Sequence, residues 1–149
     1  ICRVRAGGLS FIYFTDRDLG TQFPNILQAA GLSVERHAEH FVHNAPDAEW
    51  LAEISRRGWI ALTHNLRIRY IPNERQAVID HRASLLVIVG SAPFPDLADA
   101  FVAMLPRIER FLKKHEPPFI AKVYRPSPEE VARRVTARGR IELWYPQKW

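Results

Sequence analysis

The order of hydrophobic and polar positions along the chain predicts strands that alternate with helices. Short runs rich in apolar and β-forming residues indicate strands at 11–14, 32–36, 59–63, 85–89 and 119–124. Between them, apolar residues at helical spacing indicate helices at 22–30, 46–57, 72–82 and 97–112, the last one interrupted at Pro106. Alternating strands and helices favour a parallel sheet with helices on both faces. We therefore expect an α/β fold with a central, mainly parallel sheet of about five strands.

The last part of the chain departs from this alternation. Ser-Pro-Glu-Glu at 127–130 is a helix-capping pattern and predicts a helix over 127–134. The segment 135–145 contains β-forming residues around Gly139, which predicts a hairpin or an edge strand. No repeat or linker interrupts the chain, so we expect a single domain over residues 1–149.

Composition places the chain among ordinary globular proteins. Hydrophobic residues make up 47% of the sequence and charged residues 25%, values that indicate neither disorder nor a membrane protein. No apolar run approaches the roughly 18 residues that a membrane span needs, and the first residues do not show a secretory pattern. Cys2 is the single cysteine, which agrees with a reducing compartment. We expect a cytoplasmic protein without a membrane partner.

Positive charge is concentrated in the last third of the chain. Residues 1–102 contain 10 Lys or Arg and 11 Asp or Glu, whereas residues 103–149 contain 11 and 5. Residues 103–149, within the basic C-terminal part at 91–149, therefore supply the whole surplus of positive charge behind the net charge of +5. Such an asymmetry suits a polyanionic partner such as RNA or DNA, although a basic surface that only aids solubility explains it too.

Acidic residues recur where predicted strands end or helices begin. The first strand is followed by Asp16 and Asp18; the helix predicted at 46–57 begins near Asp47 and Glu49, and the helix predicted at 72–82 begins near Glu74. All of these acids lie in the motif-bearing half of the chain, residues 10–90. The carboxyl ends of parallel strands meet at one edge of a sheet, where ligands of open α/β folds bind. Several carboxylates without a serine or cysteine constellation favour Mg²⁺ or Mn²⁺ as cofactor. Such an ion supports phosphodiester cleavage.

Three segments also carry a family resemblance. They are Phe-Thr-Asp-Arg-Asp-Leu-Gly at 14–20, Pro-Asp-Ala-Glu-Trp-Leu at 46–51 and Arg-Gly-Trp-Ile-Ala-Leu-Thr-His-Asn at 57–65. In order and spacing, residues 10–90 resemble the PIN-like nucleases of the VapC toxin type. This resemblance implies a PIN-like three-layer α/β/α sandwich, a Mg²⁺- or Mn²⁺-dependent endoribonuclease activity, and the toxin role in a bacterial toxin–antitoxin pair.

The resemblance assigns roles to several acids. Asp16 corresponds to the first metal-binding acid, Asp47 to the second, and Glu74 to a supporting catalytic acid; Asp18 and Glu49 are further metal-ligand candidates. Such proteins usually carry an aspartate two residues beyond the threonine that ends the third strand, and this chain has Asn65 there. An amide oxygen can bind a metal or a water but brings no charge, so metal affinity should be lower.

Nearby basic residues and the resemblance suggest the partners. We expect phosphate contacts from the arginines close in sequence to the acids, Arg17, Arg67, Arg69 and Arg75. The implied partners are RNA and a cognate antitoxin, and the sequence leaves the oligomeric state open, with a homodimer as one option. Trp144, Tyr145 and Trp149 can stack on bases or pack against the core or an interface.

Three other interpretations remain open. The missing charge at Asn65 is compatible with a weakly active or inactive module that binds RNA or the antitoxin. Asp16-Arg17-Asp18 also resembles the first motif of haloacid-dehalogenase-type phosphatases, with Thr63 as a second motif, but a matching lysine and acidic pair are missing later in the sequence. Finally, His37, His40 and His43 can form a Zn²⁺ or Ni²⁺ site, although their spacing of three favours solvated loop histidines.

Overall fold

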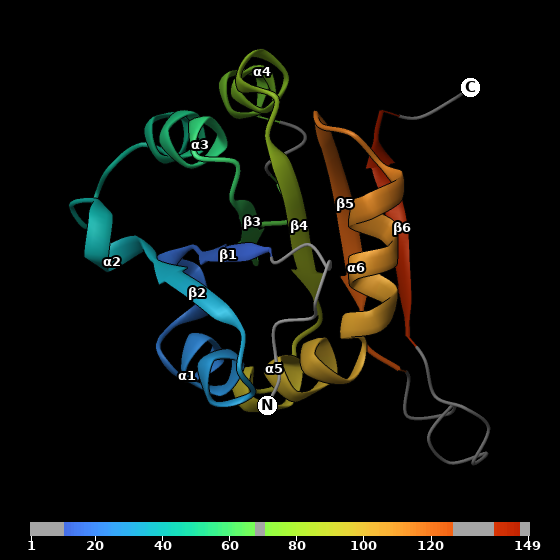
Figure 1. Cartoon of the computed structure of the whole chain (residues 1–149). Helices are drawn as coiled ribbons and strands as arrows, with labels where there is room; N and C mark the ends of the chain where they lie inside the picture. The colour runs from blue at the N-terminus through green and yellow to red at the C-terminus, as the bar shows by residue number, and fades with distance from the viewer. Residues whose placement is uncertain (1–10, 68–70, 127–138, 147–149) are drawn as a thin grey trace.

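The protein forms a six-stranded sheet in the order β2-β1-β3-β4-β5-β6 (Figure 1). The computed structural model describes residues 11–67, 71–126 and 139–146. The strands are β1 Ile12–Thr15, β2 Ser33–Arg36, β3 Ile60–Thr63, β4 Ser84–Val89, β5 Phe119–Tyr124 and β6 Arg140–Tyr145. The first five pair in parallel, and β6 pairs antiparallel to β5. The prediction of a mainly parallel sheet is confirmed, with a sixth strand at the edge where the sequence allowed one.

Helices cover both faces of this sheet and make three layers (Figure 1). The helices are the 3₁₀ helix η1 Arg17–Leu19, α1 Gln22–Ala29, α2 His37–His40, α3 Asp47–Arg56, α4 Pro72–His81, α5 Phe94–Ala103 and α6 Leu105–Lys114. One core cluster joins α1, α5 and α6 to the sheet, and the other joins α3 and α4 to its opposite face. The α/β/α sandwich predicted from the sequence is therefore the observed architecture.

Large aromatic side chains anchor the core on the α3 side. Phe14 of β1 and Trp50 of α3 are fully buried, with ring centroids 5.3 Å apart. Trp144 of β6 is 5% exposed and belongs to the same cluster. Of the interpretations given for this side chain, packing against the core is therefore the observed one. Burial of each such side chain contributes about 1.5–3 kcal/mol. This packing fixes α3, and with it Asp47, against the sheet.

Some local predictions need correction. The helix predicted at 46–57 begins at Asp47, because Pro46 is its N-cap with an extended backbone at φ −61° and ψ 148°. The predicted histidine loop contains α2, and His37 is buried between Phe14 and Phe41 instead of solvated. The interruption expected at Pro106 is confirmed, because α5 ends at Ala103 and α6 begins at Leu105. The helix predicted at 127–134, as well as Arg69 and Trp149, lies outside the described residues.

The strand order creates a switch point between β1 and β3. From β1 the chain moves through α1 to β2 on one side, and then returns to place β3 on the other side of β1. At such a point the connections from the two neighbouring strands diverge and leave a crevice beyond their carboxyl ends. Asp16 follows β1 and Thr63 ends β3, so both lie at this crevice.

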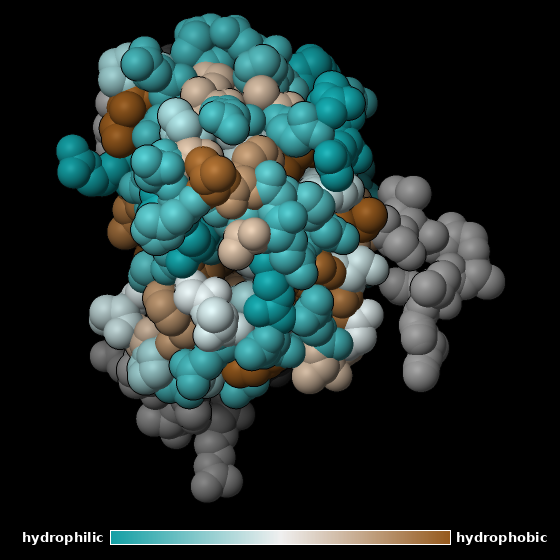
Figure 2. All heavy atoms as spheres, turned by 90° about the vertical axis from the view of Figure 1, so that its left-hand side faces the viewer, coloured by the Kyte–Doolittle hydropathy of each residue, from teal (hydrophilic) through white to brown (hydrophobic). Residues whose placement is uncertain are grey.

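The surface that carries α2 and α3 is mostly hydrophilic. Figure 2 shows hydrophobic residues scattered over this side in small groups among polar ones. Val42 and Leu66 are the large hydrophobic side chains that the described residues expose. None of the helices in the described ranges combines the length and hydrophobicity of a membrane-spanning segment.

Candidate functional site

Asp16 lies at the base of the crevice, directly after β1. The residue is only 6% exposed, and its backbone N–H donates to the carbonyl of Leu62 in β3 at 2.9 Å. Its Oδ1 accepts a hydrogen bond from the backbone N–H of Arg17 at 2.8 Å, which caps the 3₁₀ helix. This capping bond explains why an aspartate suits the turn. It does not involve the second carboxylate oxygen, Oδ2, which has a different partner.

Thr63 joins two of the acids. Its hydroxyl, at the end of β3, lies 3.0 Å from Asp16 Oδ2 and 3.0 Å from Asp18 Oδ2, so both carboxylates compete for one donated proton. The same oxygen accepts from the backbone N–H of Asn65 at 3.2 Å. Because Thr63 is fully buried, this hydroxyl fixes the two acids relative to β3.

Asp18 turns its carboxylate inward although the residue as a whole is exposed. Both carboxylate oxygens lie 3.1 Å from the backbone N–H of His64, which donates to them. Burial raises the pKa of Asp18, and the hydrogen bonds from His64 and Thr63 oppose that rise. Asp18 therefore ties the 3₁₀ turn to the end of β3.

Asp47 reaches the crevice from the first turn of α3. The helix runs back along the sheet, so its N-terminus lies at the edge where the strands end. The indole Nε1–H of Trp50 donates to Asp47 Oδ1 at 3.0 Å. Since Trp50 is fully buried, this bond orients the Asp47 carboxylate from below.

Glu74 completes the group from the first turn of α4. Its Oε1 is buried and has no hydrogen-bond partner among the described residues. Burial, and then the nearby Asp47 carboxylate, raise the pKa of Glu74 to about 7. The charge of Arg67 opposes this rise, which places that guanidinium within reach of the same acid.

The crevice contains four acids that repel one another electrostatically: Asp16, Asp18, Asp47 and Glu74. Burial raises the pKa of Asp16 to about 7, with further contributions from Asp18 and then Asp47. Asp47 raises the pKa of Asp18 and Glu74 as well. Like charges gathered in a partly buried crevice are unfavourable unless a proton or a cation lies between them. The oxygen donors and their mutual repulsion fit a hard divalent cation.

Asn65 lies beside the acids, and its side-chain oxygen already accepts a hydrogen bond. Its Oδ1 accepts a hydrogen bond from the backbone N–H of Arg67 at 3.0 Å, closing a local turn after β3. One lone pair of the amide oxygen remains available to a metal or a water. The structure thus places Asn65 at the crevice without showing a contact between its side chain and Asp16, Asp47 or Glu74 within the described ranges.

Glu49 is not brought to the crevice. It is exposed and borders a hollow on the outer side of α3, together with His40 and Arg56. Residues two positions apart on a helix point in different directions, so Asp47 and Glu49 lie on different faces of α3.

Arg17, Arg67 and Arg75 are exposed, in keeping with a role in phosphate binding that stays a prediction.

The structure also reveals residues whose role the sequence did not indicate. Trp50 is a core residue, and its spacing of three from Asp47 on one helix allows the bond to that acid. His64 is held by a bond from its Nδ1 to the Ile88 carbonyl at 2.7 Å and by edge contact with Phe94. No pattern in the sequence reveals that the His64 backbone N–H serves Asp18.

We predict that Thr63→Val destabilises the fold by about 1–3 kcal/mol at pH 8. Valine keeps the shape but removes the proton shared by Asp16 and Asp18 and the acceptor of the Asn65 N–H. Urea unfolding of the wild type and the variant measures the loss. Thr63→Ser retains the hydroxyl and should lose less than Thr63→Val; equal stability of wild type and Thr63→Val contradicts the role of the hydroxyl.

Comparison with known proteins identifies the family. The profile of the PIN-like domain family matches residues 12–90, more than half of the 149-residue chain. No significant match was found among curated proteins or among solved structures. The matched region contains β1 to β4 and all four acids of the crevice. With its nuclease-type α/β/α fold, the chain belongs to the PIN-like domain family.

Proposed function

We propose that this protein is a Mg²⁺- or Mn²⁺-dependent endoribonuclease and the toxin component of a bacterial toxin–antitoxin pair. One observation carries the proposal: three acids from different elements, Asp16, Asp47 and Glu74, lie close enough at the switch point of the sheet for Asp47 to raise the pKa of both Asp16 and Glu74. PIN-like domains are generally metal-dependent nucleases. The toxin role, a cognate antitoxin and a cytoplasmic location rest on the resemblance of residues 10–90 to the VapC type.

The donor set suits the proposed cofactor. Asp16, Asp47 and Glu74 would hold the cation, with Asp18 and the Asn65 amide oxygen as further oxygen donors. Thr63 and Trp50 position the Asp16 and Asp47 carboxylates through the bonds described above. When bound, Mg²⁺ or Mn²⁺ would stabilise the charge of the phosphodiester and acidify the attacking water.

The arginines around the crevice would bind the RNA backbone. Arg17 follows Asp16 in sequence, and the charge of Arg67 lowers the pKa of Glu74. Their exposed guanidinium groups can pair with phosphates on either side of the scissile bond. This assignment leaves the sequence of the RNA target undefined, since phosphate contacts position a nucleic acid without specifying its bases.

We expect cation binding to strengthen with pH. Asp16 and Glu74 each have a pKa of about 7, so at lower pH a cation must displace their protons. Mn²⁺ affinity should therefore rise about tenfold per pH unit for each displaced proton between pH 6 and 7, and level off above. Titration calorimetry at pH 6, 7 and 8 measures this slope.

A control variant makes this pH experiment specific. Asp16→Asn combined with Glu74→Gln keeps the side-chain shapes but removes both titrating acids, so binding should be weak and its pH dependence flat. An affinity of the wild type that stays constant between pH 6 and 8 contradicts the assignment of these two acids.

A second candidate function has its own supporting observation. Asn65 adds no charge, and its oxygen already accepts from Arg67. A module that binds RNA or the antitoxin but cleaves weakly would follow from this. Incubation with RNA and with a phosphate monoester separates the candidates: metal-dependent RNA cleavage supports the nuclease, salt-dependent binding without cleavage supports the module, and monoester hydrolysis alone supports a phosphatase.

A further inference from the structure

A second group of metal-ligating side chains lies where β2 passes into α2. Glu35 belongs to β2, and Glu39 and His40 are the third and fourth residues of α2. Each of the three offers one ligand atom, and these atoms lie within 4.8 Å of one another. The group combines one imidazole nitrogen with two carboxylates and includes none of the acids at the crevice.

Local contacts already orient this group. His40 Nε2 lies 2.7 Å from Glu35 Oε1. Glu39 Oε1 accepts from the backbone N–H of Arg36 at 2.9 Å and thereby caps the start of α2. The His40 ring stands edge-on to Trp59 with centroids 5.3 Å apart. Because the side chains are partly held, binding an ion there costs less ordering than at a set of free surface residues.

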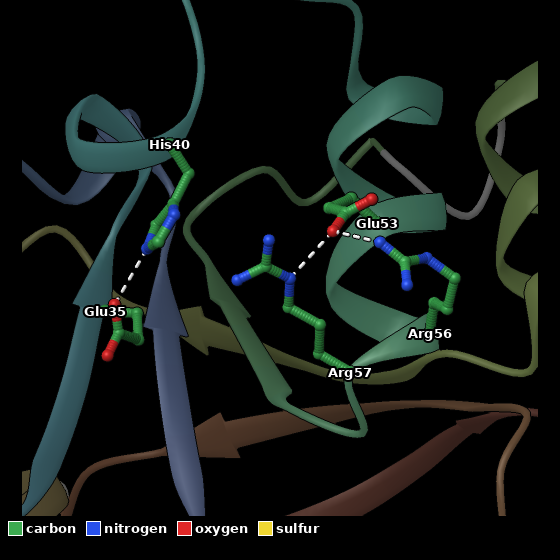
Figure 3. Close-up of polar contacts among 5 residues, drawn as sticks. All are labelled: Glu35, His40, Glu53, Arg56 and Arg57. Carbon is green, nitrogen blue, oxygen red and sulfur yellow. Dashed lines mark hydrogen bonds and ion pairs between the residues drawn. The ribbon is translucent and has the colours of Figure 1, made fainter.

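The fold separates the three histidines that the sequence groups together. His37 is buried against Phe14 and Phe41, and burial lowers its pKa. His40 instead points to Glu35 (Figure 3). The turn from strand to helix therefore groups one of these histidines with two glutamates.

An open hollow of about 570 Å³ borders the group at His40. His40 and Phe41 line one side, and α3 lines another. Figure 3 shows Glu53 on the α3 side with two arginines directed to it. Arg56 and Arg57 donate to Glu53 at 2.5 and 2.7 Å and lower its pKa to about 2. The hollow is open beside His40, so water or a small ligand has room next to that side chain.

We propose that Glu35, Glu39 and His40 form a binding site for a divalent transition metal, for which Zn²⁺ is the probe. An imidazole with carboxylates suits zinc, whereas magnesium prefers oxygen alone. Three protein ligands leave a fourth position, which the hollow can supply with water. Ligand atoms around tetrahedral zinc lie about 3.3 Å apart. The side chains of His40 and Glu35 are 24% and 36% exposed and Glu39 is exposed, so they can rotate to close around the ion.

The test measures zinc binding in a background without the first site. Asp16→Asn with Glu74→Gln removes two acids of the crevice, and the metal-free protein is then titrated with Zn²⁺ in a calorimeter. We expect one equivalent to bind. Adding His40→Ala should weaken this binding about tenfold or more, since even residues that only support a ligand are worth 10–100-fold. His81→Ala is the matched control, because His81 is exposed and borders the same hollow.

A second variant guards against a folding defect. Glu39→Gln keeps an oxygen that can accept from the Arg36 N–H, so α2 retains its cap, but it removes a negative ligand. It should also weaken zinc binding, while circular dichroism stays unchanged. The proposal is overturned if the background protein binds no zinc, or if His40→Ala and Glu39→Gln bind it as tightly as His81→Ala. Neither result bears on the proposed nuclease site, which lacks two of its four acids in this background.

Discussion

Replacing Asp16 by Asn is expected to abolish metal-dependent RNA cleavage while making the protein more stable. The variant keeps the shape of a residue that is 6% exposed and removes the charge that we assign to the cation. Loss of a direct ligand should lower cleavage more than about 100-fold, beyond the loss typical of residues that only support a ligand. Cleavage of RNA in Mn²⁺ by both proteins measures the effect.

The gain in stability follows from the pKa of this carboxyl. Asp16 ionises near pH 7 in the folded protein against an ordinary value of 3.8, so ionisation disfavours folding. The stability of the wild type therefore falls as pH rises from about 4 to 7, and Asp16→Asn removes the part of this fall that Asp16 causes, while Glu74 and Asp18 retain theirs. Without metal at pH 8, the variant should be about 2–4 kcal/mol more stable, and the two proteins should converge near pH 4.

A matched control separates this effect from a general loss of negative charge. Asp80→Asn makes the same change at an exposed residue of α4 that accepts from Gln76. It should alter neither cleavage nor the pH dependence of stability. Equal unfolding curves for the wild type and Asp16→Asn at pH 8 are incompatible with a buried, destabilising charge.

Asn65→Asp is expected to strengthen cation binding about ten- to several-hundredfold and to raise cleavage. A unit charge a few ångströms from a bound cation is worth about 1–4 kcal/mol near a protein surface. An aspartate oxygen can accept the Arg67 N–H as Asn65 does, so the turn is preserved. Without metal, the added charge should lower stability at pH 8 because it joins four acids that already repel one another.

Asn25→Asp provides the control for this second substitution. Asn25 is an exposed residue of α1 that accepts from Arg36, so an aspartate there retains its partner. Calorimetry with Mn²⁺ compares the two variants with the wild type. If Asn65→Asp and Asn25→Asp bind Mn²⁺ equally, position 65 does not contribute to the metal site.

The sequence predicted the fold well because its pattern is local and regular. Buried strands such as β4 are nearly continuous apolar runs, and the helix predicted at 72–82 is observed as α4, Pro72–His81. The sixth strand was less visible, because β6 lies at the edge of the sheet, pairs antiparallel, and buries only Trp144 fully among its exposed and half-buried residues. Such a strand is defined by its neighbour, which the sequence of one segment does not specify.

The candidate site was only partly predictable. The positions of Asp16, Asp47 and Glu74 follow from strand ends and helix starts that share an edge. Helical geometry separates Glu49 from Asp47, and the same geometry could have excluded Glu49 in advance. The bonds from Thr63 to two acids and from the His64 backbone to Asp18 depend on residues more than 40 positions apart. Such contacts arise from packing of β1 beside β3 and have no local signature.

The proposed nuclease site is tested most directly by Mn²⁺-dependent RNA cleavage with three proteins: the wild type, Asp16→Asn and Asn65→Asp. Asp16, Asp47 and Glu74 as cation ligands predict the order Asn65→Asp above wild type above Asp16→Asn, with no cleavage in a chelator. An inactive wild type with an active Asn65→Asp variant still agrees with the site and favours the binding module for the natural chain. If Asp16→Asn cleaves as fast as the wild type and Asn65→Asp gains nothing, the proposed site is contradicted.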